Sequence, residues 1–174
     1  DLCYLQRAAG DPLPPAPFPD LAGLPFSSET NADRFASMIE QTYVDTLDCP
    51  GLKGTRSGME AVVGHQTSGE FDPARWKIYS HEGRDVGLLL MNDHPDQDAW
   101  EVVYTGVVPE ARGRGYGRAI LIDGLRQVRA SGRRSLLLAV DRRNVYALDV
   151  YASLDFREIA TRAAYVRVSP DRAK

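Results

Sequence analysis

The sequence predicts an α+β domain with a mixed, mostly antiparallel sheet that is flanked by helices. Three observations support this prediction. β-type runs with turn residues between them follow one another at 76–80, 86–92 and 100–108, as in an antiparallel meander. A continuous apolar run at 135–140 is typical of a buried parallel strand. Amphipathic helical patterns flank this run on both sides.

Composition limits the class of protein. The 174 residues suit one domain with one core, and 43% hydrophobic with 26% charged residues is ordinary for a globular protein. No apolar run approaches the ~20 residues of a membrane span, so we expect no membrane association. The net charge of −3 argues against a general nucleic-acid binder. Two distant cysteines, Cys3 and Cys49, and scattered histidines predict neither disulfides nor a metal site, with a reducing, cytoplasmic setting as the default.

The first part of the chain is rich in proline. Residues 1–22 contain prolines at positions 12, 14, 15, 17 and 19. Because proline fixes φ and lacks a backbone N–H, we expect neither a regular helix nor a central strand there. We interpret residues 1–22 as an extended arm or the remnant of an upstream region, and residues 23–174 as the folded domain. The chain begins with aspartate, so a missing leader is left open.

The elements of the domain follow from local patterns. Helices are predicted where apolar residues repeat every three to four positions after a capping residue, such as Thr30 or Asn31. Strands are predicted where apolar residues cluster between turn signals. We expect strands at 24–29, 76–80, 86–92, 100–108, 135–140, 156–160 and 164–169, and helices at 31–47, 57–67, 119–130 and 144–154. The order is β-α-α-β-β-β-α-β-α-β-β.

A segment rich in glycine and arginine joins the third antiparallel strand to the next helix. Residues 107–118 read Val-Val-Pro-Glu-Ala-Arg-Gly-Arg-Gly-Tyr-Gly-Arg. The N–H groups and the dipole at a helix N-terminus attract an anion, and glycine lets the backbone approach it. Two common phosphate loops, G-x-x-x-x-G-K-[ST] and G-x-G-x-x-G, are not matched. The segment instead fits V-x-P followed by R-x-x-G-x-G.

With a second motif, this loop resembles that of the GNAT superfamily of N-acetyltransferases. The second motif, at 144–156, reads Asn-Val-Tyr-Ala-Leu-Asp-Val-Tyr-Ala-Ser-Leu-Asp-Phe. Its usual ending is Leu-Gly-Phe, so we expect Asp155 to occupy a left-handed position at the helix end. The resemblance covers roughly residues 23–174 and the order of elements. It implies the GNAT fold and a bacterial acyl-CoA-dependent N-acyltransferase of unassigned substrate.

The resemblance implies that the anion is acetyl-CoA or another acyl-CoA. Its pyrophosphate suits the helix start, its pantetheine arm pairs with the preceding strand, and the Val107 N–H polarises the thioester carbonyl. A ribose 3′-phosphate would suit Arg118, Arg142 or Arg143. The expected acyl-CoA contacts are Thr105, Gly106, Val107, Arg112, Gly113, Arg114, Gly115, Tyr116, Gly117, Arg118 and Asn144.

Acyl transfer to an amine requires a base for the ammonium and an acid for the leaving thiolate. Tyr151 matches the family's tyrosine acid, and its alternative is a core tyrosine on a helix face. Glu101, eleven residues before Arg112, matches a glutamate base of the family, and its alternative is a solvated strand residue. Asp141 and Tyr104 are weaker candidates for the base, and a water relay without a dedicated base is a further option.

The sequence also bears on where the acceptor binds and on alternative functions. The amine acceptor should lie against the first two helices, where Asp48, Glu60 and His65 are candidate polar groups. A non-catalytic acyl-CoA-binding module, acting as a sensor or partner domain, is the alternative function. A nucleic-acid-binding Arg-Gly segment is disfavoured because the run is short and lies between a strand and a helix. A homodimer is left open.

Overall fold

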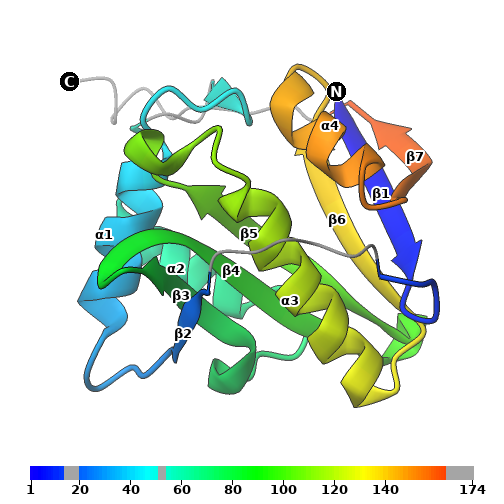
Figure 1. The fold of residues 1–174 in the computed structure, drawn as a ribbon, viewed down its shortest axis with the longest axis horizontal. Coiled ribbons are helices and arrows are strands. Elements are labelled where there is room, and N and C mark those ends of the chain that lie inside the picture. The colour runs from blue at the N-terminus through cyan, green and yellow to red at the C-terminus, as the bar shows by residue number, and fades with distance from the viewer. Residues whose placement is uncertain (14–19, 51–53, 164–174) are drawn as a thin grey trace.

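The fold is known from a computed structural model, which describes residues 1–13, 20–50 and 54–163. One seven-stranded sheet has the order β2-β3-β4-β5-β6-β1-β7. Figure 1 shows α3 and α4 in front of this sheet and α1 and α2 behind it. The elements are β1 (Leu2–Ala8), β2 (Ala22–Pro25), α1 (Ala32–Thr42), α2 (Gly58–Gln66), β3 (Trp76–His81), β4 (Arg84–His94), β5 (Ala99–Val107), α3 (Tyr116–Ser131), β6 (Ser135–Asp141), α4 (Val145–Ala152) and β7 (Arg157–Arg162).

The predicted fold class is confirmed. Strands β2 to β5 form an antiparallel meander, and β6 is parallel to β5 as its apolar sequence indicated. From β2 to β7 the order of elements is the predicted one. The strand expected at 164–169 lies outside the described residues. No described helix is both long and apolar enough to cross a membrane.

The first residues of the chain belong to the sheet, which corrects the expected arm. Strand β1 lies between β6 and β7 and is antiparallel to both. Cys3, Leu5 and Arg7 are buried, while the residues between them are less so. The prolines begin only at position 12 and therefore follow this strand. In the sequence, the signal for this strand was the apolar run at residues 2–5, which ends well before the first proline.

Strands β5 and β6 pair over only part of their length. Their parallel ladder ends where Val102 lies beside Leu138. Val103 is then an extra residue on β5, because Met91 pairs with Val102 and Leu90 with Tyr104. Such a bulge bends a strand. Past this point β5 pairs only with β4 among the described residues, and a gap opens between the carboxyl ends of β5 and β6.

Helix α3 packs closely on β4. A Cβ on Gly124 would lie 2.8 Å from the Leu89 Cδ2 atom, and a Cβ on Gly87 would lie 2.9 Å from the Ile120 Cδ1 atom. These glycines let helix and strand approach each other. The approach sets the start of α3 beside the carboxyl end of β5, next to the gap.

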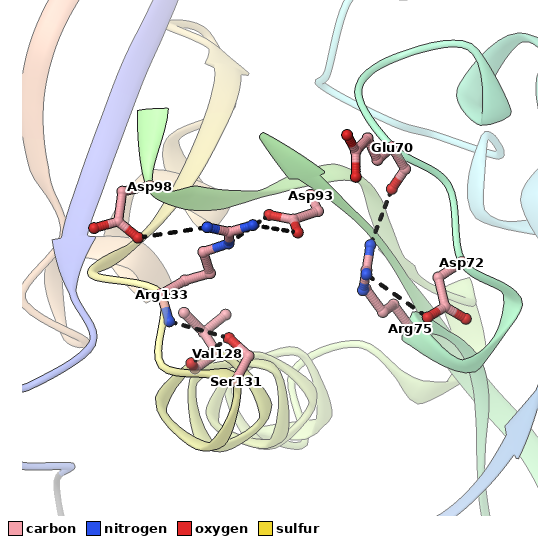
Figure 2. Close-up of polar contacts among 8 residues, drawn as sticks. All are labelled: Glu70, Asp72, Arg75, Asp93, Asp98, Val128, Ser131 and Arg133. Carbon is pink, nitrogen blue, oxygen red and sulfur yellow. Dashed lines mark hydrogen bonds and ion pairs between the residues drawn. The ribbon is translucent and has the colours of Figure 1, made fainter. Parts of the chain in front are cut away.

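The opposite end of the β5–β6 pair is closed by charged residues. The Arg133 guanidinium donates two hydrogen bonds of 2.8 Å to the Asp93 carboxylate and lies 3.7 Å from Asp98. Figure 2 shows Arg133 between these two carboxylates. The backbone N–H of Arg134 donates to the Asp98 carbonyl at 2.9 Å. These contacts join the segment after α3 to the turn between β4 and β5.

Candidate active site

The glycine-rich loop connects β5 to α3 at the open end of the gap. Gly113 has φ +73° and Gly115 has φ +81°, values that favour glycine. A Cβ on either residue would meet no atom within 4 Å. The backbone conformation, rather than lack of space, therefore requires glycine at these two positions. Together they turn the chain so that α3 begins at Tyr116.

The backbone N–H groups of residues 113–118 have no acceptor within the described part of the chain. The N–H groups on either side do have one: Arg112 donates to Pro109 and Ala119 donates to Gly115. The first turn of a helix leaves such donors free, and the dipole of the 16-residue α3 adds a positive potential there. The loop can therefore bind an anion such as a pyrophosphate.

Arg112 is used inside the protein. Its Nε donates to the Val107 carbonyl at 3.1 Å, and its Nη2 donates to the carbonyls of Thr42 at 3.0 Å and Val44 at 2.8 Å. It thus satisfies carbonyl groups at the carboxyl end of α1, which lack intrahelical donors. The Arg112 side chain thus positions the loop against α1, and its expected contact with the acyl-CoA stays a prediction.

The other arginines differ in whether their side chains have partners among the described residues. Arg114 and Arg118 form no ion pair or side-chain hydrogen bond with a described residue. Arg142 donates to Glu158 and Thr161 at 2.8 Å each, and Arg143 pairs with Asp141. Of the three arginines considered for a 3′-phosphate, Arg118 is the one without such partners.

The edge of β5 faces the gap with free backbone groups. The Val108 N–H donates to the Val86 carbonyl on the β4 side. Since successive N–H groups of a strand point to opposite edges, the Val107 N–H points toward the gap. Thr105 donates its hydroxyl to the Leu88 carbonyl at 3.0 Å. Gly106 lies against α1, where a Cβ would be 2.8 Å from the Thr42 Cβ.

Helix α4 begins where β6 ends and carries Tyr151. Asn144 caps the helix, and its Oδ1 accepts the Ala147 N–H at 3.3 Å. Tyr151 is 6% exposed, and its ring lies 5.7 Å from that of Phe156. Burial raises the pKa of Tyr151 well above its ordinary value, and the charge of Asp48 raises it further. The phenol is therefore neutral at pH 7 and has a proton to donate.

The end of α4 confirms one detail of the motif. Asp155 has φ +62°, the left-handed conformation expected for the residue that replaces glycine. Its N–H donates to the Ala152 carbonyl at 3.0 Å, and the Phe156 N–H donates to the Tyr151 carbonyl at 3.1 Å. The substitution therefore changes the residue type but keeps the turn.

Glu101 is not a solvated strand residue. Its Oε2 lies 2.8 Å from the His94 Nε2 and accepts a hydrogen bond of 3.3 Å from the Ser68 hydroxyl. The His94 Nε2 is therefore within ion-pair distance of Glu101, but this buried nitrogen forms no hydrogen bond with a described residue. The Glu101 side chain is 26% exposed. Glu101 thus lies on the α1–α2 face of β5, in the part of the strand that still pairs with β6.

An aromatic cluster covers the same face nearer the gap. The Tyr104 hydroxyl lies 2.7 Å from that of Thr42, and its ring lies 5.8 Å from Tyr43 and 5.4 Å from His65. Arg56 donates to the Tyr43 hydroxyl at 3.1 Å. The sequence singled out only His65 and Tyr104, because the members come from separate elements that no local pattern connects.

Two pKa shifts describe this cluster. Burial, with the Arg56 charge as a second cause, lowers the pKa of His65 to about 4, so its ring is neutral at pH 7. Burial raises the pKa of Tyr104 well above its ordinary value, so this phenol keeps its proton at pH 7 and is poorly suited to accept the proton of an amine. Of the other acidic candidates, Glu60 forms a capping box with Ser57 at the start of α2.

Asp48 reaches from the loop after α1 to the end of β6. Its Oδ1 accepts the Asp141 N–H at 2.8 Å. The next N–H, that of Arg142, donates to the Asp1 carbonyl on the β1 side, so the Asp141 N–H points the other way, toward β5. Asp48 therefore lies at the gap. Burial raises the pKa of its carboxyl group.

No group of three or more potential metal ligands occurs among residues 1–13, 20–50 and 54–163. The site offers groups that can bind an anion, pair with an extended chain and donate or accept protons. They are free N–H donors at a helix start, an open strand edge, a buried phenol and nearby carboxylates.

The chain is similar in sequence to relatives of known name. A mycothiol acetyltransferase from Thermobispora bispora is 33% identical over 172 residues, which are 95% of this chain and 57% of the relative. One from Thermomonospora curvata is 35% identical over 112 residues, which are 64% of this chain and 37% of that protein. The chain thus spans about half the length of the curated relatives it matches.

Solved structures agree on the fold. A GCN5-related N-acetyltransferase from Sphaerobacter thermophilus superposes with a TM-score of 0.69 at 18% identity, over 90% of this chain and 48% of that chain. The diaminobutyrate acetyltransferase of Paenibacillus lautus, solved with its substrate and coenzyme A, gives a TM-score of 0.56 at 18% identity, over 78% of this chain and 75% of that chain. The model of the acetyltransferase (GNAT) family matches residues 42–156. The chain belongs to the GNAT acetyltransferase family.

Proposed function

We propose that this chain is an acyl-CoA-dependent N-acyltransferase, which transfers the acetyl group of acetyl-CoA to a primary amine of a small molecule or peptide. One observation carries the proposal. The start of α3 carries N–H donors without an acceptor among the described residues, beside the part of β5 that does not pair with β6, and α4, which carries the buried phenol of Tyr151, begins directly after β6. Direct attack of the amine in a ternary complex needs these groups together.

The donor is held in two parts. The N–H groups of residues 113–118 bind the pyrophosphate, and the unpaired cations of Arg114 and Arg118 add charge-assisted contacts. The pantetheine arm lies along the edge of β5 that β6 leaves free, beside Thr105 and Gly106. This places the thioester near Val107, whose N–H polarises the carbonyl as a one-donor oxyanion hole.

The reaction then moves two protons. The amine nitrogen forms a bond to the thioester carbon, and its excess proton passes to the Glu101 carboxylate, directly or through water. The carbon–sulfur bond breaks as the tetrahedral intermediate collapses, and Tyr151 donates its proton to the leaving CoA thiolate. Glu101 has His94 2.8 Å away, which stabilises the carboxylate when the ring is protonated.

The proposal extends to the acceptor amine and to the cellular compartment. The name of the curated relatives suggests the acceptor of mycothiol acetyltransferases as the first amine to test. A reducing, cytoplasmic setting fits Cys3 and Cys49, which are free thiols.

A combined binding and turnover experiment tests the proposal. Acetyl-CoA should raise the melting temperature of the purified chain, because a ligand of the native state stabilises it. Free-thiol release with a panel of primary amines should reveal transfer. Tyr151→Phe should lower kcat by about 100-fold, the usual scale of a general acid, with unchanged acetyl-CoA affinity. Glu101→Gln should lower kcat and flatten the acid limb of the pH–rate profile.

The alternative function has its own signature. A non-catalytic module would show the same thermal shift without CoA release for any amine, and both variants would keep their affinity. No thermal shift at saturating acetyl-CoA or longer acyl-CoAs would reject both functions.

A further inference from the structure

The partly buried carboxylates of this protein almost all have a cationic partner. In the described part of the chain, these carboxylates belong to Asp48, Asp72, Asp85, Asp93, Asp98, Glu101, Asp123 and Asp141. All but Asp48 lie within 4.0 Å of an arginine, lysine or histidine nitrogen. Figure 2 shows two such arrangements, around Arg75 and Arg133. A partly buried charge is normally paired in this way.

Asp48 is the exception, and it is firmly placed. Its backbone N–H donates to the Thr46 hydroxyl at 3.1 Å, and its Oδ1 accepts the Asp141 N–H at 2.8 Å. No other hydrogen bond or ion pair to a described residue involves its Oδ2. The carboxylate is therefore oriented by the backbone, with one oxygen free for a further donor.

The surroundings of Asp48 belong to the transfer site. The Asp141 N–H that it accepts points into the gap between β5 and β6. The helix that carries Tyr151 begins beside Asp141, because the Asn144 N–H donates to the Asp141 carbonyl at 2.8 Å. The loop that carries Asp48 begins at the aromatic cluster, because the Thr46 N–H donates to the Tyr43 carbonyl at 3.3 Å. The rings of Tyr104, Tyr43 and His65 pack together beside this loop, and aromatic rings attract cations.

We propose that the Asp48 carboxylate binds the ammonium group of the acceptor and thereby selects primary amines over neutral nucleophiles. This inference rests on the proposed function and names the group that recognises its second substrate. An ammonium supplies both the missing positive charge and the hydrogen-bond donor that the free Oδ2 lacks. It also brings the nitrogen beside Tyr151, where the leaving group is protonated.

A binding experiment tests the inference without turnover. The CoA-saturated full chain is titrated in a calorimeter with phenethylamine and with 2-phenylethanol, which carries a hydroxyl in place of the ammonium. The wild-type protein should bind the amine at least about tenfold more tightly than the alcohol. Asp48→Asn keeps an oxygen for the Asp141 N–H but removes the charge, and it should abolish this preference.

The matched control is Asp45→Asn. Asp45 is an exposed residue of the same loop with φ +52°, a conformation that asparagine tolerates. It removes the same charge and should keep the preference. An unchanged acetyl-CoA thermal shift in Asp48→Asn shows that the fold and donor site are intact.

The outcomes separate the two proposals. Retention of the amine preference in Asp48→Asn, or absence of any preference in the wild type, overturns the role of Asp48. An amine preference that depends on Asp48, without acetyl transfer to any amine, supports this role and rejects the proposed function instead.

Discussion

The two ends of the β5–β6 pair differ in what their polar groups do. At the closed end, the strands are hydrogen-bonded from Ala99 to Val102, and Arg133 joins the partly buried Asp93 and Asp98. At the open end, the strands separate. Among the described residues, the N–H groups of residues 113–118 have no acceptor and Asp48 has no cationic partner.

The difference teaches how one strand pair serves two purposes. Ladder hydrogen bonds and buried ion pairs stabilise the native state only when both partners are present. Donors and acceptors without an internal partner stabilise a bound ligand instead. We therefore expect substitutions at the closed end to change stability and substitutions at the open end to change binding.

The largest effect on acetyl-CoA binding is expected from a substitution at the start of α3. Gly115 and Gly132 stand at the two ends of this helix with nearly the same conformation, φ +81° and φ +82°, both at ψ 0°. A Cβ would meet no atom within 4 Å at either position. Gly115→Val and Gly132→Val should therefore share a similar loss of stability, on the order of 1–2 kcal/mol of backbone strain.

Only Gly115→Val should lower the affinity for acetyl-CoA, by about tenfold or more, because only this substitution displaces the free N–H donors. Calorimetric titration with acetyl-CoA, alongside a thermal melt, measures both quantities. Equal affinity in the two variants would show that the loop does not bind the donor.

A loss of stability without loss of binding is expected at the closed end. Arg133→Met leaves the Asp93 carboxylate, 9% exposed, without its cation, and unpaired buried charges are strongly unfavourable. The melting temperature should fall by several degrees, while the acetyl-CoA dissociation constant stays unchanged.

The neighbouring Arg134→Met is the control for Arg133→Met. The Arg134 side chain is 86% exposed in its ion pair with Asp98, and exposed pairs contribute little. The melting temperature should therefore barely change. A weaker acetyl-CoA affinity in Arg133→Met would contradict the separation of the two ends.

A pH dependence of the free energy of unfolding is expected at the open end. The pKa of His65 is about 4 in the folded protein and about 6.5 in the unfolded chain. Between these values the unfolded chain binds the extra proton, so stability is complete above pH 6.5 and falls as the pH is lowered toward 4. The full effect is at most about 3 kcal/mol.

The His65→Phe variant keeps a ring beside Tyr104 and should lose this part of the pH dependence. Denaturant unfolding at pH 7 and pH 5 measures how much the free energy of unfolding changes with pH in the two proteins. An equal change in both would show that His65 titrates alike in the folded and unfolded states.

Local patterns predicted much of the fold and the donor site. The start of α2 directly after Ser57 and the left-handed Asp155 depend on neighbouring residues, so sequence reasoning reached them. Strand β1 was missed because its place between β6 and β7 depends on pairing with residues more than a hundred positions away. The internal role of Arg112 was missed for the same reason, since its acceptors lie on α1.

The sequence by itself determined the order of elements from β2 to β7, the glycine positions of the anion-binding loop and the family, because backbone conformation and helix termini are set by nearby residues. Tertiary structure decided which charges are paired and which remain free. Arg112 and Asp48 both looked like surface or ligand-binding charges. The folded chain gives the arginine three carbonyl acceptors and gives the aspartate no cation among the described residues. Only three-dimensional packing brings such distant partners together.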